Sequence, residues 1–233
     1  MLRWSIKSVA RADAVSEAEI TAGSPRLAIA RPGGKSHTYR MATADEIVIL
    51  RIELQGIEPL IWRRVAVSTR ISLTGVHRVV QAAMGWLDCH LWDFEVSGRK
   101  YSMHLPGDPD WNERIENADM ITLGGLLRAG ERQMQYVYDM GDFWEHSIIS
   151  EKVTAPVAEV SYPQFLGGER RCPPEDCGGP FGYGEFLRKI SSKQRKTREG
   201  ALDWYGGPYD PDDIDERKVI AALSRIASGR AKR

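Results

Sequence analysis

Residues 46–54 read EIVILRIEL, and the fold class follows from this stretch. Its apolar residues recur at the two-residue spacing of a β-strand that has one fully apolar face. The residues predicted on that face are Val48, Leu50, Ile52 and Leu54. A turn at Glu58-Pro59 leads to residues 61–67, which also carry apolar side chains on one side. Two strands joined by so short a turn pair antiparallel, so the stretch predicts a β-hairpin.

Two more hairpins follow along the chain. One turns at Ser97-Gly98, and the other joins two alternating segments through Gly141-Asp142. Between the first hairpin and the second, Ser72 is a suitable N-cap for an amphipathic helix that ends near Gly85. Because hairpins imply antiparallel pairing, we expect an α+β fold, with helices packed on an antiparallel, hairpin-built sheet.

The remaining segments complete this outline. Polar or glycine- and proline-rich loops are predicted at residues 108–118 and 163–180, and helices at residues 122–129, 183–191 and 211–228. The last helix has Asp210 as its expected N-cap and Pro211 in its first turn.

One compact domain is expected over residues 46–228. Residues 1–45 are predicted to be a flexible extension, since the second half of this segment contains several prolines and glycines and little periodicity. The alternative is that translation begins at Met41. Residues 229–233 are predicted to be a basic tail.

The overall charge gives no sign of a nucleic-acid-binding protein. Lysine plus arginine and aspartate plus glutamate both number 32, whereas a protein that binds mainly through phosphates usually has a basic excess. A local basic patch remains sufficient for such binding. One candidate lies between Arg188 and Arg198, where six basic residues fall within eleven positions; the alternative is a solvated helix end and loop.

The cysteines and the N-terminus favour a cytoplasmic protein. Three cysteines in a chain of this length do not make a secreted disulfide framework. Charged residues interrupt the first twenty positions, so no signal peptide is predicted, and no apolar stretch is long enough to span a bilayer. We therefore expect no membrane partner.

The stretch from Tyr138 to His146 reads YDMGDFWEH and concentrates polar chemistry around a glycine turn. A carboxylate beside an imidazole fixes the tautomer of the ring and raises its basicity, so Asp139, Asp142 and His146 are candidates for a metal site or a general base. The alternative is a tight hairpin whose Trp144 packs in the core.

The stretch from Cys172 to Gly184 reads CPPEDCGGPFGYG. Four residues separate Cys172 from Cys177, which is the upper edge of the spacing in structural zinc pairs. With His146 as a further donor, these residues are a candidate zinc site. The alternative is a rigid loop that packs its thiols inward.

Another candidate surface begins at residues 89–94, CHLWDF, where His90 and Trp92 fall on the same strand face. A histidine beside apolar residues is also typical of the edge of a core. The predicted binding surface therefore consists of His90, Trp92, Asp139, Asp142, Trp144 and His146, with the loop that starts at Cys172.

The hairpin motif, the cysteine loop and residues 204–214, in this order, resemble the plasmid pRiA4b ORF-3-like family. The segment PLIWRR that starts at Pro59 also resembles the opening of that family. The resemblance extends over about residues 46–226 and implies a compact α+β fold. Some family members are named after the TnpR passenger protein of an insertion element, which implies a link to DNA transposition or resolution.

Three functions remain open on these grounds. The first is a non-enzymatic accessory or binding protein of a mobile-element-associated family. The second is a metal-dependent enzyme that uses the cluster of Asp139, Asp142 and His146 with Cys172 and Cys177. The third is a direct DNA-binding protein that uses the basic residues between Arg188 and Arg198.

Overall fold

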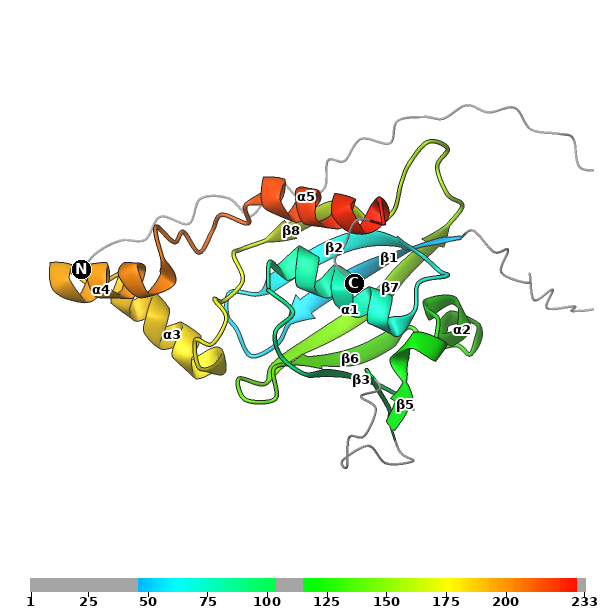
Figure 1. Ribbon diagram of the computed structural model, residues 1–233, viewed down its shortest axis with the longest axis horizontal. Helices are drawn as coiled ribbons and strands as arrows, with labels where there is room; N and C mark the ends of the chain where they lie inside the picture. The colour runs from blue at the N-terminus through cyan, green and yellow to red at the C-terminus, as the bar shows by residue number, and fades with distance from the viewer. Residues whose placement is uncertain (1–45, 104–114, 230–233) are drawn as a thin grey trace, which may run out of the picture. The chain divides into compact units, whose positions relative to one another are not determined.

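A single twisted sheet organises the computed structural model, which describes residues 46–103 and 115–229 (Figure 1). In these residues, eight strands follow the order β5-β4-β3-β6-β7-β1-β2-β8, and every neighbouring pair is antiparallel except β4 with β5. The strands are β1 (Ile47–Leu54), β2 (Ile61–Ser68), β3 (Trp92–Val96), β4 (Arg99–Ser102), β5 (Ile115–Asn117), β6 (Gln133–Tyr138), β7 (Trp144–Thr154) and β8 (Gln164–Glu169). The α+β prediction is confirmed.

The described residues also form helices between and after the strands. They are α1 (Leu73–Met84), the 3-10 turn η1 (Ala118–Met120), α2 (Leu123–Arg128), α3 (Gly179–Ile190), α4 (Arg195–Tyr205) and α5 (Glu216–Ala227). No helix in the described ranges has the length and apolar character that crossing a membrane requires. Residues 46–103 and 115–229 belong to one compact unit, and the predicted extension at residues 1–45 and positions 230–233 of the predicted tail lie outside the described residues.

The core lies between the sheet and helix α1. Strand β1 sits between β2 and β7, and its even-numbered residues from Val48 to Leu54 are fully buried, as the alternation predicts. Helix α1 packs over this part of the sheet and α5 lies beside α1 (Figure 1). The Ser72 hydroxyl accepts a hydrogen bond from the Gly75 amide at 3.2 Å, and Gly85 ends α1 in the left-handed region at φ 88°, so both predicted ends of this helix are confirmed.

Four elements differ from the sequence prediction. Part of the loop predicted at residues 108–118 forms β5 and the start of η1, and positions 108–114 lie outside the described residues. The predicted loop after Pro163 contains β8. Its two adjacent glycines, Gly167 and Gly168, are unusual in a strand, so the sequence pattern indicated a loop. A Cβ on Gly168 would lie 2.6 Å from the Trp62 carbonyl oxygen, so a glycine is needed where β8 passes β2.

The two other differences concern helices. Helix α4 was not predicted, because its first half is basic and its buried face, at Ala201, is too short to give a clear apolar periodicity. Helix α5 begins at Glu216 and not at Pro211. Asp210 and Asp213 instead cap turns, with their carboxylates accepting the amides of Asp212 at 3.0 Å and Asp215 at 2.8 Å.

Candidate metal centre

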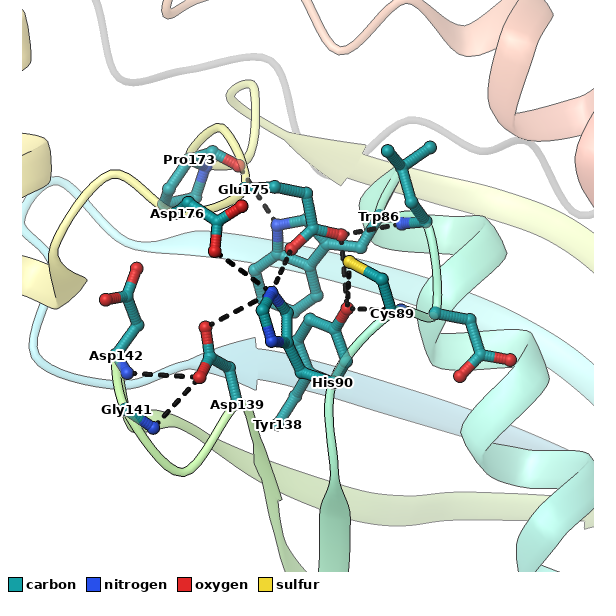
Figure 2. Close-up of polar contacts among 12 residues, drawn as sticks. Trp86, Cys89, His90, Tyr138, Asp139, Gly141, Asp142, Pro173, Glu175 and Asp176 are labelled. Atoms are coloured by element: carbon teal, nitrogen blue, oxygen red, sulfur yellow. Dashed lines mark hydrogen bonds and ion pairs between the residues drawn. The ribbon is translucent and has the colours of Figure 1, made fainter.

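Three loops meet at one end of the sheet (Figure 2). They are the connection between α1 and β3 at residues 85–91, the turn between β6 and β7 at residues 139–143, and the loop between β8 and α3 at residues 170–178. Strand register explains why the first two are neighbours: Trp92 at the start of β3 pairs with Tyr138 at the end of β6, and Tyr138 pairs with Trp144 at the start of β7.

His90 stands at the centre of this cluster. Its Nε2 atom lies 3.1 Å from Asp176 Oδ1, 3.6 Å from Asp139 Oδ2 and 4.0 Å from Glu175 Oε2. Figure 2 shows the three carboxylates arranged around the imidazole. Although Nε2 is shielded from solvent, it makes no hydrogen bond of acceptable geometry with any described residue. Each carboxylate comes from a loop that does not carry His90, so tertiary structure builds the cluster.

The turn between β6 and β7 holds Asp139 in a fixed orientation. Asp139 adopts a left-handed backbone conformation at φ 60°, and its Oδ1 accepts the amides of Gly141 at 2.9 Å and Asp142 at 3.3 Å. This bonding leaves Oδ2 directed toward His90. One carboxylate oxygen therefore holds the turn and the other is available to a ligand.

The two carboxylate oxygens of Glu175 also have different roles, one in holding the loop and one toward His90. Its Oε1 accepts hydrogen bonds from the Leu87 amide at 2.7 Å and from the Tyr138 hydroxyl at 3.1 Å. Burial raises the pKa of Tyr138, so the hydroxyl stays protonated and donates a hydrogen bond to the carboxylate. The second oxygen, Oε2, is buried without a hydrogen-bond partner among the described residues and faces His90.

A buried network fixes the segment that carries Cys89 and His90. His77 bonds Asp88 Oδ1 through Nε2 at 2.7 Å and the Tyr136 hydroxyl through Nδ1 at 2.7 Å. The Asp88 amide donates to the Gln81 side chain at 3.0 Å, and the Cys89 amide donates to the Tyr138 hydroxyl at 3.1 Å. These bonds anchor the two residues before His90 on both sides.

The loop with Glu175 and Asp176 is fastened at both ends. At its far end, Asp142 Oδ2 accepts the Gly178 amide at 3.0 Å, and a Cβ on Gly179 would lie 2.5 Å from the Asp142 carbonyl oxygen. At its near end, the fully buried Arg63 donates to the carbonyls of Ala83 at 2.9 Å and Glu169 at 2.8 Å. Close glycine packing at one end and a buried guanidinium at the other hold this acidic loop against His90.

The distances among these groups fit a shared metal ion. Ligands about 2.1 Å from a tetrahedral ion lie roughly 3.4 Å apart, and ligands at right angles lie roughly 3.0 Å apart. The ligand atoms of His90, Asp139 and Asp176 lie within 4.8 Å of one another, as do those of Cys89, His90 and Glu175. The donor set of one imidazole, carboxylates and a nearby thiol suits Zn²⁺, Mn²⁺ or Fe²⁺ better than Mg²⁺ or Ca²⁺, which take oxygen ligands.

The structure divides the predicted binding surface in two. His90 and Asp139 lie in the cluster, and Asp142 supports it through Gly178. Trp92, Trp144 and His146 are core residues, each at most 3% exposed, so none of them contributes to an exposed surface. Their packing explains this placement: Trp92 stacks on His77 at 4.2 Å between ring centroids, and His146 meets Trp86 edge-on at 5.3 Å.

The proposed zinc ligands Cys172, Cys177 and His146 belong to neither of the described groups of neighbouring metal-ligand atoms. Cys172 Sγ instead lies 3.6 Å from Arg63 Nη2 and 3.0 Å from Met84 Sδ. Burial raises the pKa of Cys172 to about 11 and that of Cys177 to about 12, so both are protonated thiols near neutral pH. A zinc site at these residues stays a prediction, and the two described groups of neighbouring ligand atoms lie around His90.

The two groups around His90 consist of His90, Asp139, Glu175, Asp176 and Cys89. Glu175 and Asp176 lie inside the cysteine loop, but neither was singled out as a ligand. The available signal was the pair of adjacent acids between Pro174 and Cys177, which a simple proline–glycine loop does not require.

Comparison with known proteins agrees with this fold and assigns the family. The chain matches the model of the plasmid pRiA4b ORF-3-like protein family over residues 46–218, and it belongs to that family. It is 34% identical over 189 residues to the uncharacterized protein y4hQ of Sinorhizobium fredii, an alignment that covers 80% of this chain and 95% of y4hQ.

A solved structure shares the fold. The crystal structure of the protein of unknown function MM3350 from Methanosarcina mazei Go1 matches with a TM-score of 0.68 at 28% identity, covering 75% of this chain and 98% of that one. Both relatives are uncharacterised, so the case for function rests on the chemistry of the site.

Proposed function

We propose that this protein binds one divalent transition-metal ion through His90, Asp139 and Asp176, with Glu175 and Cys89 beside the ion. The observation that carries the proposal is the convergence of three carboxylates on His90 Nε2, which has no hydrogen bond within the described residues. A divalent ion supplies two positive charges beside the three carboxylates and gives each free oxygen a partner.

The energetics of this cluster favour an ion. A buried polar atom left without a hydrogen bond costs about 1–3 kcal/mol, and Glu175 Oε2 is in that condition. Asp139 and Glu175 already use their other oxygens to hold the loops, so neither can turn away without breaking backbone contacts. Such support of ligands by their own hydrogen bonds is typical of metal sites.

The site is also open to solvent on one side. The side chain of Asp176 is 71% exposed and that of His90 is 27% exposed, whereas Asp139 is buried. We infer that the ion keeps positions for water or for an exogenous ligand. A bound ion with such a position lowers the pKa of its water and polarises a bound substrate, which is the basis of metal-dependent hydrolysis.

Calorimetric titration of metal-free protein with Zn²⁺ and Mn²⁺ tests the proposal. We expect one equivalent to bind to the wild type, and His90→Ala, Asp139→Asn and Asp176→Asn each to weaken the affinity at least about tenfold. Glu145→Gln is the matched control, because Glu145 is an exposed acid that follows the same turn. Absence of stoichiometric binding, or equal affinities in the four variants, would contradict the assignment.

The link to DNA transposition or resolution that the family resemblance implies stays a prediction. It requires contact with nucleic acid, which strand-binding measurements test separately from metal binding.

A further inference from the structure

A groove of about 590 Å³ is lined by residues of α3 and α4 and by Asp176 of the metal cluster. Its volume falls within the range of roughly 300–1,000 Å³ that is usual for small-ligand sites. We call it the α3–α4 groove; the residues that matter here are Asp176, Phe186, Lys189, Lys196, Gly200 and Trp204. Asp176 belongs both to this groove and to the metal cluster, so the two sites are contiguous.

The groove offers a flat aromatic surface. Trp204 is 54% exposed, yet its ring is braced by the buried Phe186, with ring centroids 5.6 Å apart and planes at 60°. Gly200 lies one helical turn before Trp204, on the same face of α4, and no atom would lie within 4 Å of a Cβ placed there. The tryptophan therefore presents an unobstructed, fixed surface to a planar ring.

The groove also holds positive charge. Neither Lys189 nor Lys196 forms a close ion pair with a residue in the described ranges, although Lys189 interacts with Glu185 at longer range. Their arginine neighbours differ, because Arg188 pairs with Glu185 and Arg195 pairs with Glu199 at 2.7 Å. The first turn of α4, which carries Lys196, contains no acid to offset this charge. Two ammonium groups outside close ion pairs, in the same groove as an aromatic platform, favour a ligand that combines an anion with a planar ring.

We propose that the α3–α4 groove binds a nucleotide unit of single-stranded nucleic acid, with the base on Trp204 and the phosphate between Lys189 and Lys196. Stacking of a base on an aromatic side chain is worth about 1–3 kcal/mol, and it requires a base face that duplex pairing conceals. Lys196 and Trp204 are eight residues apart on α4, or about 12 Å along the helix axis. A nucleotide and an extended lysine side chain together span this separation.

This arrangement revises how the basic segment between Arg188 and Arg198 contributes. The sequence contains no aromatic residue among these basic positions, but Trp204 lies about two turns beyond Lys196 on α4 and lines the same groove. The lysines and the tryptophan do not depend on a bound metal. Only the statement that the groove lies next to a metal ion, which follows from Asp176 belonging to both sites, rests on the function proposed above.

Fluorescence anisotropy with a labelled single-stranded oligonucleotide, in excess EDTA, tests the groove without the metal. We expect Trp204→Ala to weaken binding about tenfold. The double variant Lys189→Gln/Lys196→Gln removes the contact with one phosphate, so it should reduce the slope of log affinity against log salt by about 0.7, the contribution of one phosphate contact on a single strand. Phe181→Ala and Lys193→Gln are controls outside the groove lining, and both should bind as the wild type does.

Several outcomes would overturn the strand proposal. These are absence of strand binding at low salt, equal weakening in the controls, or a duplex that binds as tightly as the single strand. A free mononucleotide that binds as tightly as the strand would assign the groove to nucleotides and would also overturn it. Asp139→Asn separates the two proposals, because it should weaken metal binding at least about tenfold and leave strand affinity in EDTA unchanged. A loss of strand affinity in this variant, with its thermal unfolding unchanged, would count against an independent groove.

Discussion

His146 makes the stability of this fold depend on pH. Complete burial lowers the pKa of His146 to about 4 from its usual value of 6.5, and the hydrogen bonds to backbone groups of Tyr136 and Trp144 only partly oppose this effect. The folded state therefore holds a neutral ring, while the unfolded chain takes up a proton below pH 6.5. Stability from this residue is complete above pH 6.5 and decreases as the pH falls toward 4.

The magnitude follows from the separation of the two pKa values. Linkage gives a loss of about 2 kcal/mol at pH 5 and about 3 kcal/mol at pH 4, with a limiting slope of about 1.4 kcal/mol per pH unit. Burial also lowers the pKa of His77, so the wild type should show an additional dependence in the same direction.

The perturbation is His146→Phe, which keeps an aromatic ring beside Trp86 and Tyr136 but cannot titrate. Urea unfolding in EDTA at fixed ionic strength, from pH 7.5 to pH 4.5, should show that the variant loses less stability than the wild type as the pH falls. Ile148→Val is the control, since it removes one buried methyl group and should lower stability by about 1 kcal/mol at every pH. Parallel pH profiles for His146→Phe and the wild type would refute the reasoning.

Three further predictions concern the supports of the site. Arg63→Met should lower the free energy of unfolding by about 3 kcal/mol or more, because it leaves buried carbonyls without donors, whereas Arg64→Met on the exposed side should cost less than about 1 kcal/mol by the same urea titration. Gly168→Ala should lower thermal stability by about 1–3 kcal/mol through its contact with the Trp62 carbonyl, while Gly184→Ala, with open space around it in α3, should be neutral or stabilising. Tyr138→Phe should weaken metal affinity by about 10–100-fold in calorimetric titration, because Glu175 loses a donor; unchanged affinity would show that the hydroxyl does not orient this carboxylate.

Periodicity was sufficient for the central part of the fold. The alternation from Val48 to Leu54 predicted the buried face of β1, and the Ser72 and Gly85 caps predicted both ends of α1, because these signals depend on neighbouring residues alone. Strand β8 was not predicted because the reason for its Gly168 is a close approach to the carbonyl of Trp62. Trp62 is distant in the sequence, so no local pattern reveals this contact.

The candidate site was only partly predictable for the same reason. His90 and Asp139 stood out by residue type, but the loop at residues 170–178 that brings Glu175 and Asp176 to them is positioned by Arg63, Asp142 and Gly179. Trp144 and His146 were attractive by composition, yet the register of β7 directs both side chains into the core. A polar motif thus predicted the end of the sheet where the proposed site lies, together with two side chains that are buried in the core.

The central claim is that His90, Asp139 and Asp176 share one ion. The most direct measurement is an anomalous difference map from crystals of the wild type grown with Mn²⁺. We expect one peak about 2.1–2.2 Å from His90 Nε2, in contact with carboxylate oxygens of Asp139 and Asp176, and its loss in His90→Ala crystals. A map with no peak at His90, or one whose peak persists in the His90→Ala variant, would contradict the account.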